Sequence, residues 1–353
     1  MDQNSLKRIY TFYFMQKLVL LFLFFILYNA SYSQVIKGKV IDKETGSTIS
    51  FALIYFNGTF VGTQSDLNGD FNLDISKNTS MPLTISGIGY YSVTLSSFSA
   101  ANPLIVYLAP KVYEMQEVVI SSKSLVRKRK ANLKLFKNEF LGITENGRNC
   151  DILNENDITF NYNTDQDTLK AFASKPILIN NKSLGYSIIF NLDKFEYDKK
   201  SRSFFYKGNM FFNKDLAIGS LHKDEYNKRR KHAFEGSKMH FFRSLWSDEL
   251  EFVGFTVKNS NNYYVDYNDI VITDKIHRDS INSFTKFLKY TDFLRIYYLK
   301  SSTITFIKEN VGFNEDGYFD KLGLKWEGEM ATHRIGDQLP YEYIPLSKMN
   351  IHE

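Results

Sequence analysis

The sequence predicts a mainly β protein in which an N-terminal β-sandwich is followed by a mixed, β-rich α+β domain. Residues 70–75 alternate polar and apolar side chains with the period of two that is typical of a half-buried strand. Similar short runs follow at close spacing, separated by turn residues such as Asn57-Gly58 and Asn68-Gly69. Aromatic residues make up 16% of the chain, and few residues are proline, which favours sheet over disorder.

Seven of these runs account for the sandwich. Phe71, Leu73 and Ile75 share one face of their run, and burying each side chain contributes about 1.5–3 kcal/mol, which is enough to hold a short strand on a core. The seven strands are expected at residues 36–42, 51–56, 61–65, 70–75, 83–88, 91–95 and 104–108.

Several spaced elements occur in this segment in a fixed order, and they are Gly38-Lys39-Val40-Ile41-Asp42, Thr45-Gly46, Phe51-Ala52, Gly62-Thr63, Asp66-Leu67-Asn68-Gly69-Asp70-Phe71 and Gly89-Tyr90. With them, residues 34–121 resemble the carboxypeptidase regulatory-like domain. The resemblance implies a transthyretin-like sandwich and a protein of the Gram-negative cell envelope. It departs from the family at Ile49-Ser50-Phe51-Ala52, where many members have Pro-Leu-Pro-Gly-Ala.

The first 33 residues have the order of a secretory signal peptide. Lys7, Arg8 and Lys17 precede an apolar run at 18–28, and small residues lead to an expected cleavage after Ser33. The alternative is a retained anchor, but the apolar run is short of the roughly 20 residues that cross a bilayer. We therefore expect an exported protein of the periplasm or outer membrane.

Two features of the chain suggest a metal or a reactive group. Asp66, Asn68 and Asp70 resemble the opening of a calcium loop, but the twelfth position is Lys77 where an EF-hand loop needs a bidentate Glu, so we favour a simple turn. Cys150 is the only cysteine, which excludes an intramolecular disulfide. We expect it to be a small buried residue, with a reactive thiol as the alternative.

A basic segment follows the sandwich. Residues 122–132 are expected to be a solvated linker, which carries Lys123, Arg127, Lys128, Arg129 and Lys130. These cations suggest a peripheral contact with anionic lipid or lipopolysaccharide phosphates. The preceding Glu117-Val118-Val119-Ile120 resembles the TonB coupling segment of receptors that carry such a sandwich, which leaves a TonB-linked outer-membrane component as a second alternative. We favour its interpretation as the last strand of the sandwich.

Residues 133–353 are expected to form the second domain. The spacing of Leu133, Phe136 and Phe140 predicts a helix that ends near Gly142 or Gly147, and residues 224–246 fit a single amphipathic helix. Strands are expected at 158–162, 169–174, 184–192, 195–197, 204–210, 293–307 and 322–334.

The second domain also resembles the uncharacterised region that follows the regulatory-like domain in related envelope proteins. The residues that carry this resemblance are Phe140-Leu141-Gly142, Cys150-Asp151-Ile152-Leu153-Asn154, Leu184-Gly185-Tyr186, Gly236-Ser237, His240-Phe241 and the closing Leu339-Pro340-Tyr341. The resemblance implies no activity.

The sharpest suggestion of an enzyme is a zinc site. His222 and Glu225 have the His-x-x-Glu spacing of a metallocarboxypeptidase, and His333 follows 108 residues after Glu225. Such a site needs three protein ligands and a general base, yet the family places that base several tens of residues after the last His, and only twenty residues follow His333 here. We hold this hydrolase as the first alternative.

The sequence therefore favours a non-enzymatic protein that acts by binding or assembly. The formal charge is +5, of which two charges belong to residues 1–33, and this mild excess does not indicate nucleic acid. We expect no catalytic, cofactor or metal residues. An envelope protein, peptide or glycan is the expected kind of partner. A small membrane barrel is disfavoured because alternating segments of about ten residues are not sustained.

Overall fold

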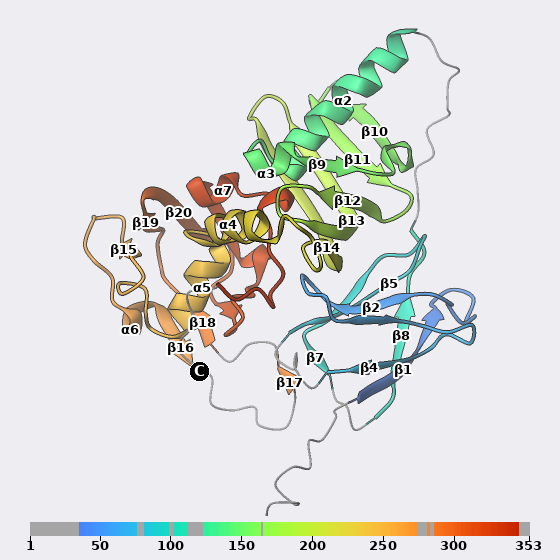
Figure 1. Cartoon of the computed structure of the whole chain (residues 1–353), viewed down its shortest axis with the longest axis horizontal. Coiled ribbons are helices and arrows are strands. Elements are labelled where there is room, and N and C mark those ends of the chain that lie inside the picture. The colour runs from blue at the N-terminus through green and yellow to red at the C-terminus, as the bar shows by residue number, and fades with distance from the viewer. Residues whose placement is uncertain are drawn as a thin grey trace, which may run out of the picture.

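The computed structural model describes residues 35–75, 81–98, 102–111, 123–163, 165–273, 281–282 and 286–345. The expected signal peptide and the Glu117–Ile120 run lie outside these residues. The protein is mainly β. In Figure 1 the sandwich (blue to cyan) adjoins a second sheet (green to yellow), and the last strands (orange to red) lie beside both. None of the described helices combines the length and the apolar character needed to span a bilayer.

The N-terminal unit is a sandwich of two sheets. One sheet has the order β4-β1-β8 and the other β3-β2-β5-β6, which confirms seven strands. The strands are β1 Val35–Asp42, β2 Leu53–Phe56, β3 Gly62–Gln64, β4 Asp70–Asp74, β5 Leu83–Ser86, β6 Val93–Leu95 and β8 Leu104–Leu108. An additional strand, β7 (Ser97–Phe98), pairs outside the sandwich with β17 (Ile281–Asn282).

The alternation in β4 has the predicted result. Phe71, Leu73 and Ile75 are buried in the core, whereas Asp70 and Asn72 are exposed. The strand is antiparallel to β1, which pairs on its other edge with β8 in parallel. The pattern of side chains therefore fixes which face of this edge strand meets the opposite sheet.

A six-stranded sheet follows. Five of its strands lie in the order β10-β11-β13-β12-β9, the sixth, β14, pairs with the long strand β13, and all these pairings are antiparallel. The elements are α3 Glu145–Arg148, β9 Cys150–Ile152, η1 Glu155–Asp157, β10 Ile158–Asn163, β11 Thr168–Ala173, β12 Ile177–Asn181, β13 Tyr186–Asp198 and β14 Ser203–Asp215. The turn expected near 198–203 connects β13 to β14.

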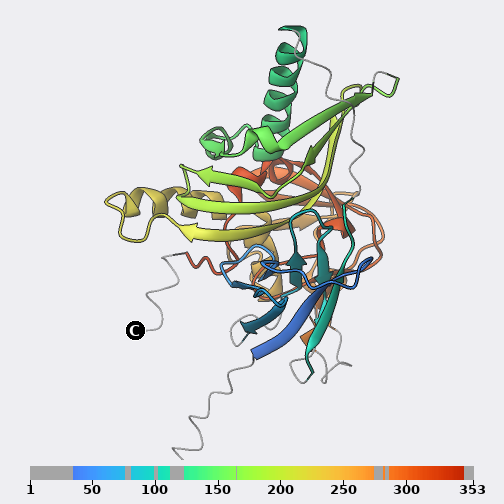
Figure 2. The same ribbon diagram turned by 90° about the vertical axis from the view of Figure 1, so that its right-hand side faces the viewer.

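One helix, α2 (Lys123–Leu141), covers a face of this sheet. Phe136 stacks on Phe140 with ring centroids 4.9 Å apart and packs against Phe195 at 4.8 Å. The helix ends where predicted, at Gly142, whose φ is +102°. The helix begins earlier than expected. Residues 123–132, which were expected to be a solvated basic linker, instead form its first half, and this half extends beyond the strands in Figure 2.

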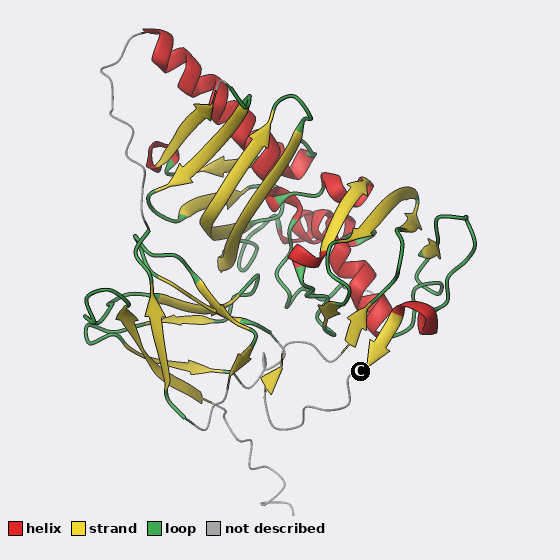
Figure 3. Ribbon diagram, turned by 180° about the vertical axis from the view of Figure 1, so that it is seen from behind, coloured by secondary structure: helices red, strands yellow, loops and turns green. Residues whose placement is uncertain are grey.

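The single helix expected at 224–246 is wrong, because the chain forms two. They are α4 (Lys223–Phe234) and α5 (Lys238–Trp246), separated by Glu235-Gly236-Ser237. Gly236 has a φ of +73°, a left-handed conformation that a regular helix does not contain. Both helices lie between the six-stranded sheet and the last group of strands (Figures 1 and 3).

The last third of the chain builds a second hydrophobic core. Phe241, Phe242 and Leu245 of α5 are fully buried in it, whereas the first core runs continuously from the sandwich into the six-stranded sheet. The buried residues of 133–353 thus divide between two cores. The remaining elements are β15 Thr256–Lys258, α6 Tyr267–Ile270, β16 Val271–Thr273, β18 Lys286–Leu288, β19 Leu294–Tyr298, β20 Lys300–Phe306, β21 Val311–Phe313, η2 Lys321–Gly323, β22 Leu324–Gly328, α7 Glu329–Thr332 and η3 Ile335–Asp337.

Candidate functional site

The bend between α4 and α5 leaves the first turn of α5 open. A Cβ added to Gly236 would lie 2.6 Å from Cδ1 of Tyr298, so the bend needs glycine for space as well as for its φ. Ser237 is the N-cap, and its hydroxyl accepts a hydrogen bond from His240 N at 3.1 Å. Within the described residues, the amides of Lys238 and Met239 have no hydrogen-bond acceptor.

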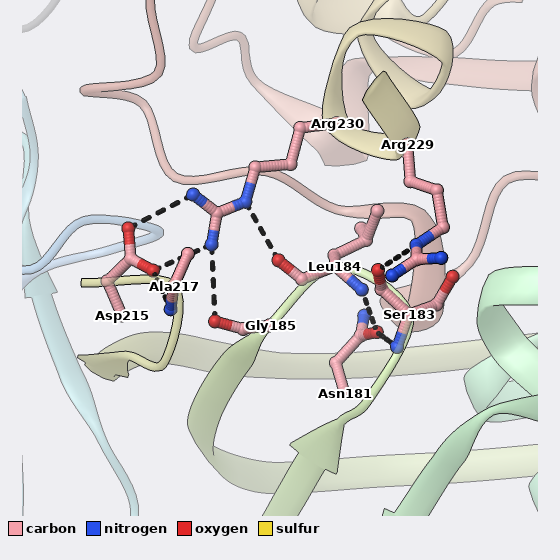
Figure 4. Close-up of polar contacts among 8 residues, drawn as sticks. All are labelled: Asn181, Ser183, Leu184, Gly185, Asp215, Ala217, Arg229 and Arg230. Carbon is pink, nitrogen blue, oxygen red and sulfur yellow. Dashed lines mark hydrogen bonds and ion pairs between the residues drawn. The ribbon is translucent and has the colours of Figure 1, made fainter. Parts of the chain in front are cut away.

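Two arginines of α4, the helix that precedes α5, attach it to the six-stranded sheet (Figure 4). The buried guanidinium of Arg230 contacts both carboxylate oxygens of Asp215, at 2.7 and 3.1 Å, and donates to the carbonyls of Leu184 and Gly185. Arg229 Nε donates to the neighbouring carbonyl of the same turn at 2.6 Å. These cations therefore attach α4 to the β12–β13 turn and are not free to bind a ligand.

A buried carboxylate organises the other side of the site. Asp337, at the end of η3, accepts hydrogen bonds from Thr144 Oγ1 at 2.9 and 3.0 Å and from Asn146 Nδ2 at 3.0 Å. Asn181 Nδ2 donates to the carbonyl of Gly336 at 2.8 Å. Residues far apart in the sequence thus hold η3 against α3 and the end of β12.

A pocket lies between the start of α5 and the segment that follows α7. Ser237, Lys238 and Met239 line one side, and His333 and Asp337 line the other. Its free space of about 30 Å³ is enough for one or two water molecules.

The pocket has charges of both signs, because the carboxylate of Asp337 lines it beside Lys238. Burial, together with the nearby cations Arg334 and Lys321, lowers the pKa of Lys238 to about 7. Burial also lowers the pKa of His333, and the Nδ1 atom of that imidazole is buried without a hydrogen-bond partner. The guanidinium of Arg334 lies 4.0 Å from the ring centroid of Phe204.

The structure does not assemble the zinc site that the sequence suggested. His222 Nδ1 and Glu225 Oε1 are 3.7 Å apart at the exposed start of α4, where Glu225 also meets Arg229. His333 instead follows α7 and lines the pocket. Among the described residues, no group of three or more His, Cys, Asp or Glu side chains could hold a metal. The hydrolase alternative with His222, Glu225 and His333 is therefore wrong, because its residues are exposed on one helix or buried elsewhere.

The other two candidate sites are the Cys150 thiol and the Asp66–Asp70 segment, and ordinary local contacts account for both. Cys150 is buried, its thiol contacts the carbonyl of Asn146 at 3.3 Å, and burial raises its pKa to about 12. The carboxylate of Asp66 accepts hydrogen bonds from the amides of Asn68 and Asp70, at 2.8 and 2.9 Å. The Asp66–Asp70 segment is thus the simple turn that the sequence favoured.

Sequence reasoning missed Lys238, Arg334 and Asp337. The pair Gly236-Ser237 was noticed, and a glycine followed by an N-cap residue is a sequence signal for a new helix, so the open turn of α5 could have been found. No local pattern indicates that a lysine beside that cap meets a histidine some 95 residues later.

The comparison with known families concerns the sandwich. Residues 36–120, about a quarter of the chain, match the family model described as CarboxypepD_reg-like domain. The sandwich is a CarboxypepD_reg-like domain. Such a domain is a non-catalytic β-sandwich. No curated protein matches the chain.

The CarboxypepD_reg-like domain is joined to the six-stranded sheet by buried polar contacts. Asn191 Nδ2, on β13, donates to Tyr55 Oη at 3.1 Å and to Ser86 Oγ at 3.2 Å. Two backbone hydrogen bonds also connect the sandwich at Gly58 to the rest of the chain. Gly58 N donates to Met210 O of β14, and Tyr341 N donates to Gly58 O. The domain and the sheet are therefore packed as one body with a shared core.

A second candidate surface lies on α2, outside the CarboxypepD_reg-like domain. Arg127, Lys130 and Lys134 are exposed and spaced by three and four residues, so they lie on one face of the helix. The opposite face buries Phe136 and Phe140 against the sheet. We call these three cations the α2 stripe.

Proposed function

We propose that this protein is an exported, non-enzymatic envelope protein that acts by binding, and that the α2 stripe contacts a phosphate-bearing membrane surface. The α2 stripe is the observation that carries the proposal. Its cations have no ion-pair partner among the described residues, and the first turn of the helix has no acidic residue.

The position of the stripe is unfavourable for the isolated protein. Like charges spaced by three or four residues on one helix face repel each other. Arg129 shows the contrast, because its guanidinium turns to the protein and donates to the carbonyls of Ile158 and Glu155 at 2.7 and 2.8 Å. An anionic surface would offset the unfavourable charge of the three residues that face outward.

An anionic bilayer matches the chemistry of the stripe. Each Lys or Arg near such a surface contributes about 1 kcal/mol of attraction, which falls with salt. Three cations would therefore change binding by roughly 100-fold at low ionic strength.

Co-sedimentation with vesicles of phosphatidylcholine and phosphatidylglycerol tests the proposal. We expect the triple variant Arg127→Gln, Lys130→Gln, Lys134→Gln to lose most of the binding. A matched control removes Lys223, Lys228 and Lys231 from α4, also with glutamine, and is expected to bind almost normally. Equal loss in both variants, or wild-type binding that does not weaken with salt, contradicts a contact through α2.

Export is tested separately. The sequence of residues 1–33 supports a cleaved signal peptide, and the CarboxypepD_reg-like sandwich, which has no disulfide in a chain with one cysteine, is compatible with either redox compartment. We expect the intact mass of the protein recovered from cells to correspond to a chain that begins at Gln34. A chain that still begins at Met1 contradicts cleavage.

A further inference from the structure

We infer that Asn68 is a site of spontaneous deamidation in the folded protein, at which water displaces the side-chain ammonia through a cyclic imide formed with Gly69. The inference is independent of the α2 stripe, since Asn68 lies in the turn between β3 and β4 of the sandwich. It rests on the different surroundings of the three Asn-Gly pairs that the chain contains.

The chemistry needs an asparagine whose side chain can reach the amide of the next residue. The nitrogen of that amide attacks the side-chain carbonyl carbon, and the side-chain nitrogen leaves as ammonia. One water molecule then opens the imide at either carbonyl and yields aspartate or isoaspartate, so the reaction consumes one water and releases one ammonia. Asparagine is thermolabile for this reason, and a following glycine helps because no Cβ obstructs the approach of its amide.

Asn68 has the side-chain freedom that this reaction requires. Its side chain is exposed to solvent and has no hydrogen-bond partner within the described ranges of the chain. The contacts of the residue are made by its main chain, because Asn68 N donates to Asp66 Oδ1 at 2.8 Å and Asn68 O accepts from Lys39 Nζ at 2.9 Å. The side chain can therefore rotate towards the amide of Gly69 without breaking a contact of the fold.

The other two asparagines are held by their side chains. Asn57 is only 7% exposed, and its Oδ1 accepts a hydrogen bond from Met210 N of the six-stranded sheet at 2.8 Å. Asn146 is half-buried, donates through Nδ2 to Asp337 at 3.0 Å and accepts through Oδ1 from Ser183 Oγ at 2.6 Å. Either side chain must give up these hydrogen bonds before it can reach the following glycine, which costs free energy.

The glycine amides do not account for the difference between the three pairs. All three amides donate a hydrogen bond, Gly58 N to Met210 O at 2.6 Å, Gly69 N to Asp66 O at 3.1 Å and Gly147 N to Thr144 Oγ1 at 3.1 Å. The attacking nitrogen is thus restrained in each pair, and the freedom of the asparagine side chain is what sets Asn68 apart.

Deamidation changes the turn in two ways. It adds a carboxylate between Asp66 and Asp70, which gives the protein one more negative charge. Where water opens the imide at the main-chain carbonyl, the isoaspartate also lengthens the main chain by one carbon atom before Gly69. Gly69 O accepts a hydrogen bond from Val40 N at 2.9 Å, so the longer chain disturbs the contact between this turn and β1.

Peptide mass spectrometry of the purified protein, kept at pH 8.5 and 37 °C, tests the inference. We expect Asn68 to convert roughly tenfold or more faster than Asn57 and Asn146, because a residue that reacts only after local opening is slowed by the free energy of that opening. In guanidinium chloride the three sites should convert at similar rates. The inference is overturned if Asn68 converts no faster than the other two in the native protein, or if its lead persists in the denaturant, since the sequence and not the fold would then be the cause.

Ion-exchange chromatography provides a second measurement, because each conversion adds one negative charge. Asn68→Ser should abolish the main acidic form that accumulates in the wild type. Asn72→Ser is the matched control, since Asn72 is also exposed but precedes Leu73 and not a glycine, and it should leave the acidic form unchanged. In ¹⁸O-labelled water, one heavy oxygen should enter residue 68. An acidic form that persists in Asn68→Ser, or that carries no heavy oxygen, contradicts deamidation at this position.

Discussion

Lys111 Nζ lies 3.8 Å from Asp193 Oδ1 across the junction between the CarboxypepD_reg-like domain and the six-stranded sheet. Only 12% and 11% of the two side chains are exposed, and the ammonium also donates to the carbonyl of Leu192 at 3.0 Å. Burial lowers the pKa of Lys111 and raises that of Asp193, while each charge partly offsets the shift of the other. The junction therefore contains a charge pair that is favourable only while both partners are present.

Removing one partner should be costly. Asp193→Ala leaves the ammonium of Lys111 buried with one carbonyl, and we expect the free energy of unfolding to fall by about 3 kcal/mol. Urea denaturation measures the loss. The double variant with Lys111→Met should recover much of it, since no unpaired charge remains. Glu327→Ala is the control, because its ion pair with Lys325 is exposed and is expected to contribute under about 1 kcal/mol. A similar loss in both single variants would show that burial of the junction pair has no special effect.

Gly336 should tolerate no side chain. A Cβ at this position would lie 2.4 Å from Gly147 Cα and 2.7 Å from Leu141 O, and these backbone atoms cannot rotate away. We expect Gly336→Ala to reduce stability by about 3 kcal/mol. Gly219→Ala provides the comparison, because that glycine has a φ of +75° and open space around it, so only about 1 kcal/mol of backbone strain is expected. Thermal or urea unfolding gives both values, and equal losses would mean that η3 and α3 can separate at little cost.

Cys150 should be unreactive in the folded protein. Its thiol is buried and its pKa is raised to about 12, so little thiolate exists at neutral pH. We expect an aromatic disulfide reagent to label Cys150 only after denaturant is added, with one equivalent released. Rapid labelling of the native protein at pH 7.5 would contradict the burial and restore the reactive-thiol alternative.

Most of the sandwich could be predicted because its information is local. Phe71, Leu73 and Ile75 alternate with polar residues, and the half-buried edge strand reproduces that alternation directly. The division of residues 224–246 into two helices was missed for a related reason. The apolar residues keep a helical spacing through Gly236, and only its contact with Tyr298, from β19, makes the bend a requirement of the fold.

The candidate site was less predictable because tertiary packing creates it. Lys238 is an ordinary charged residue in the sequence, and it becomes unusual only where Arg334 and His333 come close to it. The reverse applies to His222 and Glu225, whose spacing suggested zinc. Residues three apart on a helix are always neighbours, so the contact between His222 and Glu225 needs no metal. A zinc site would also need a third ligand, which only the tertiary fold could bring close.

The pocket should also make stability depend on pH through Lys238. Its pKa is about 7 in the folded protein, against the 10.5 of an ordinary lysine in the unfolded chain, so between these pH values the unfolded chain binds more protons than the native one. Stability attributable to this lysine therefore rises with pH from about 7 to 10.5, with a slope of at most about 1.4 kcal/mol per pH unit, and the full penalty remains below pH 7. Arg334, Lys321 and His333 lie near the ammonium. Burial lowers the pKa of Lys321 to about 8, so Lys321 also loses its charge within this window, whereas the pKa of His333 is lowered and its imidazole is neutral there. In phosphate-free buffer we expect Lys238→Met to be more stable than the wild type at pH 6 and to approach it near pH 10. Urea titrations at several pH values, with Lys228→Met as the control, measure this difference, and parallel curves for all three proteins would mean that Lys238 remains fully solvated.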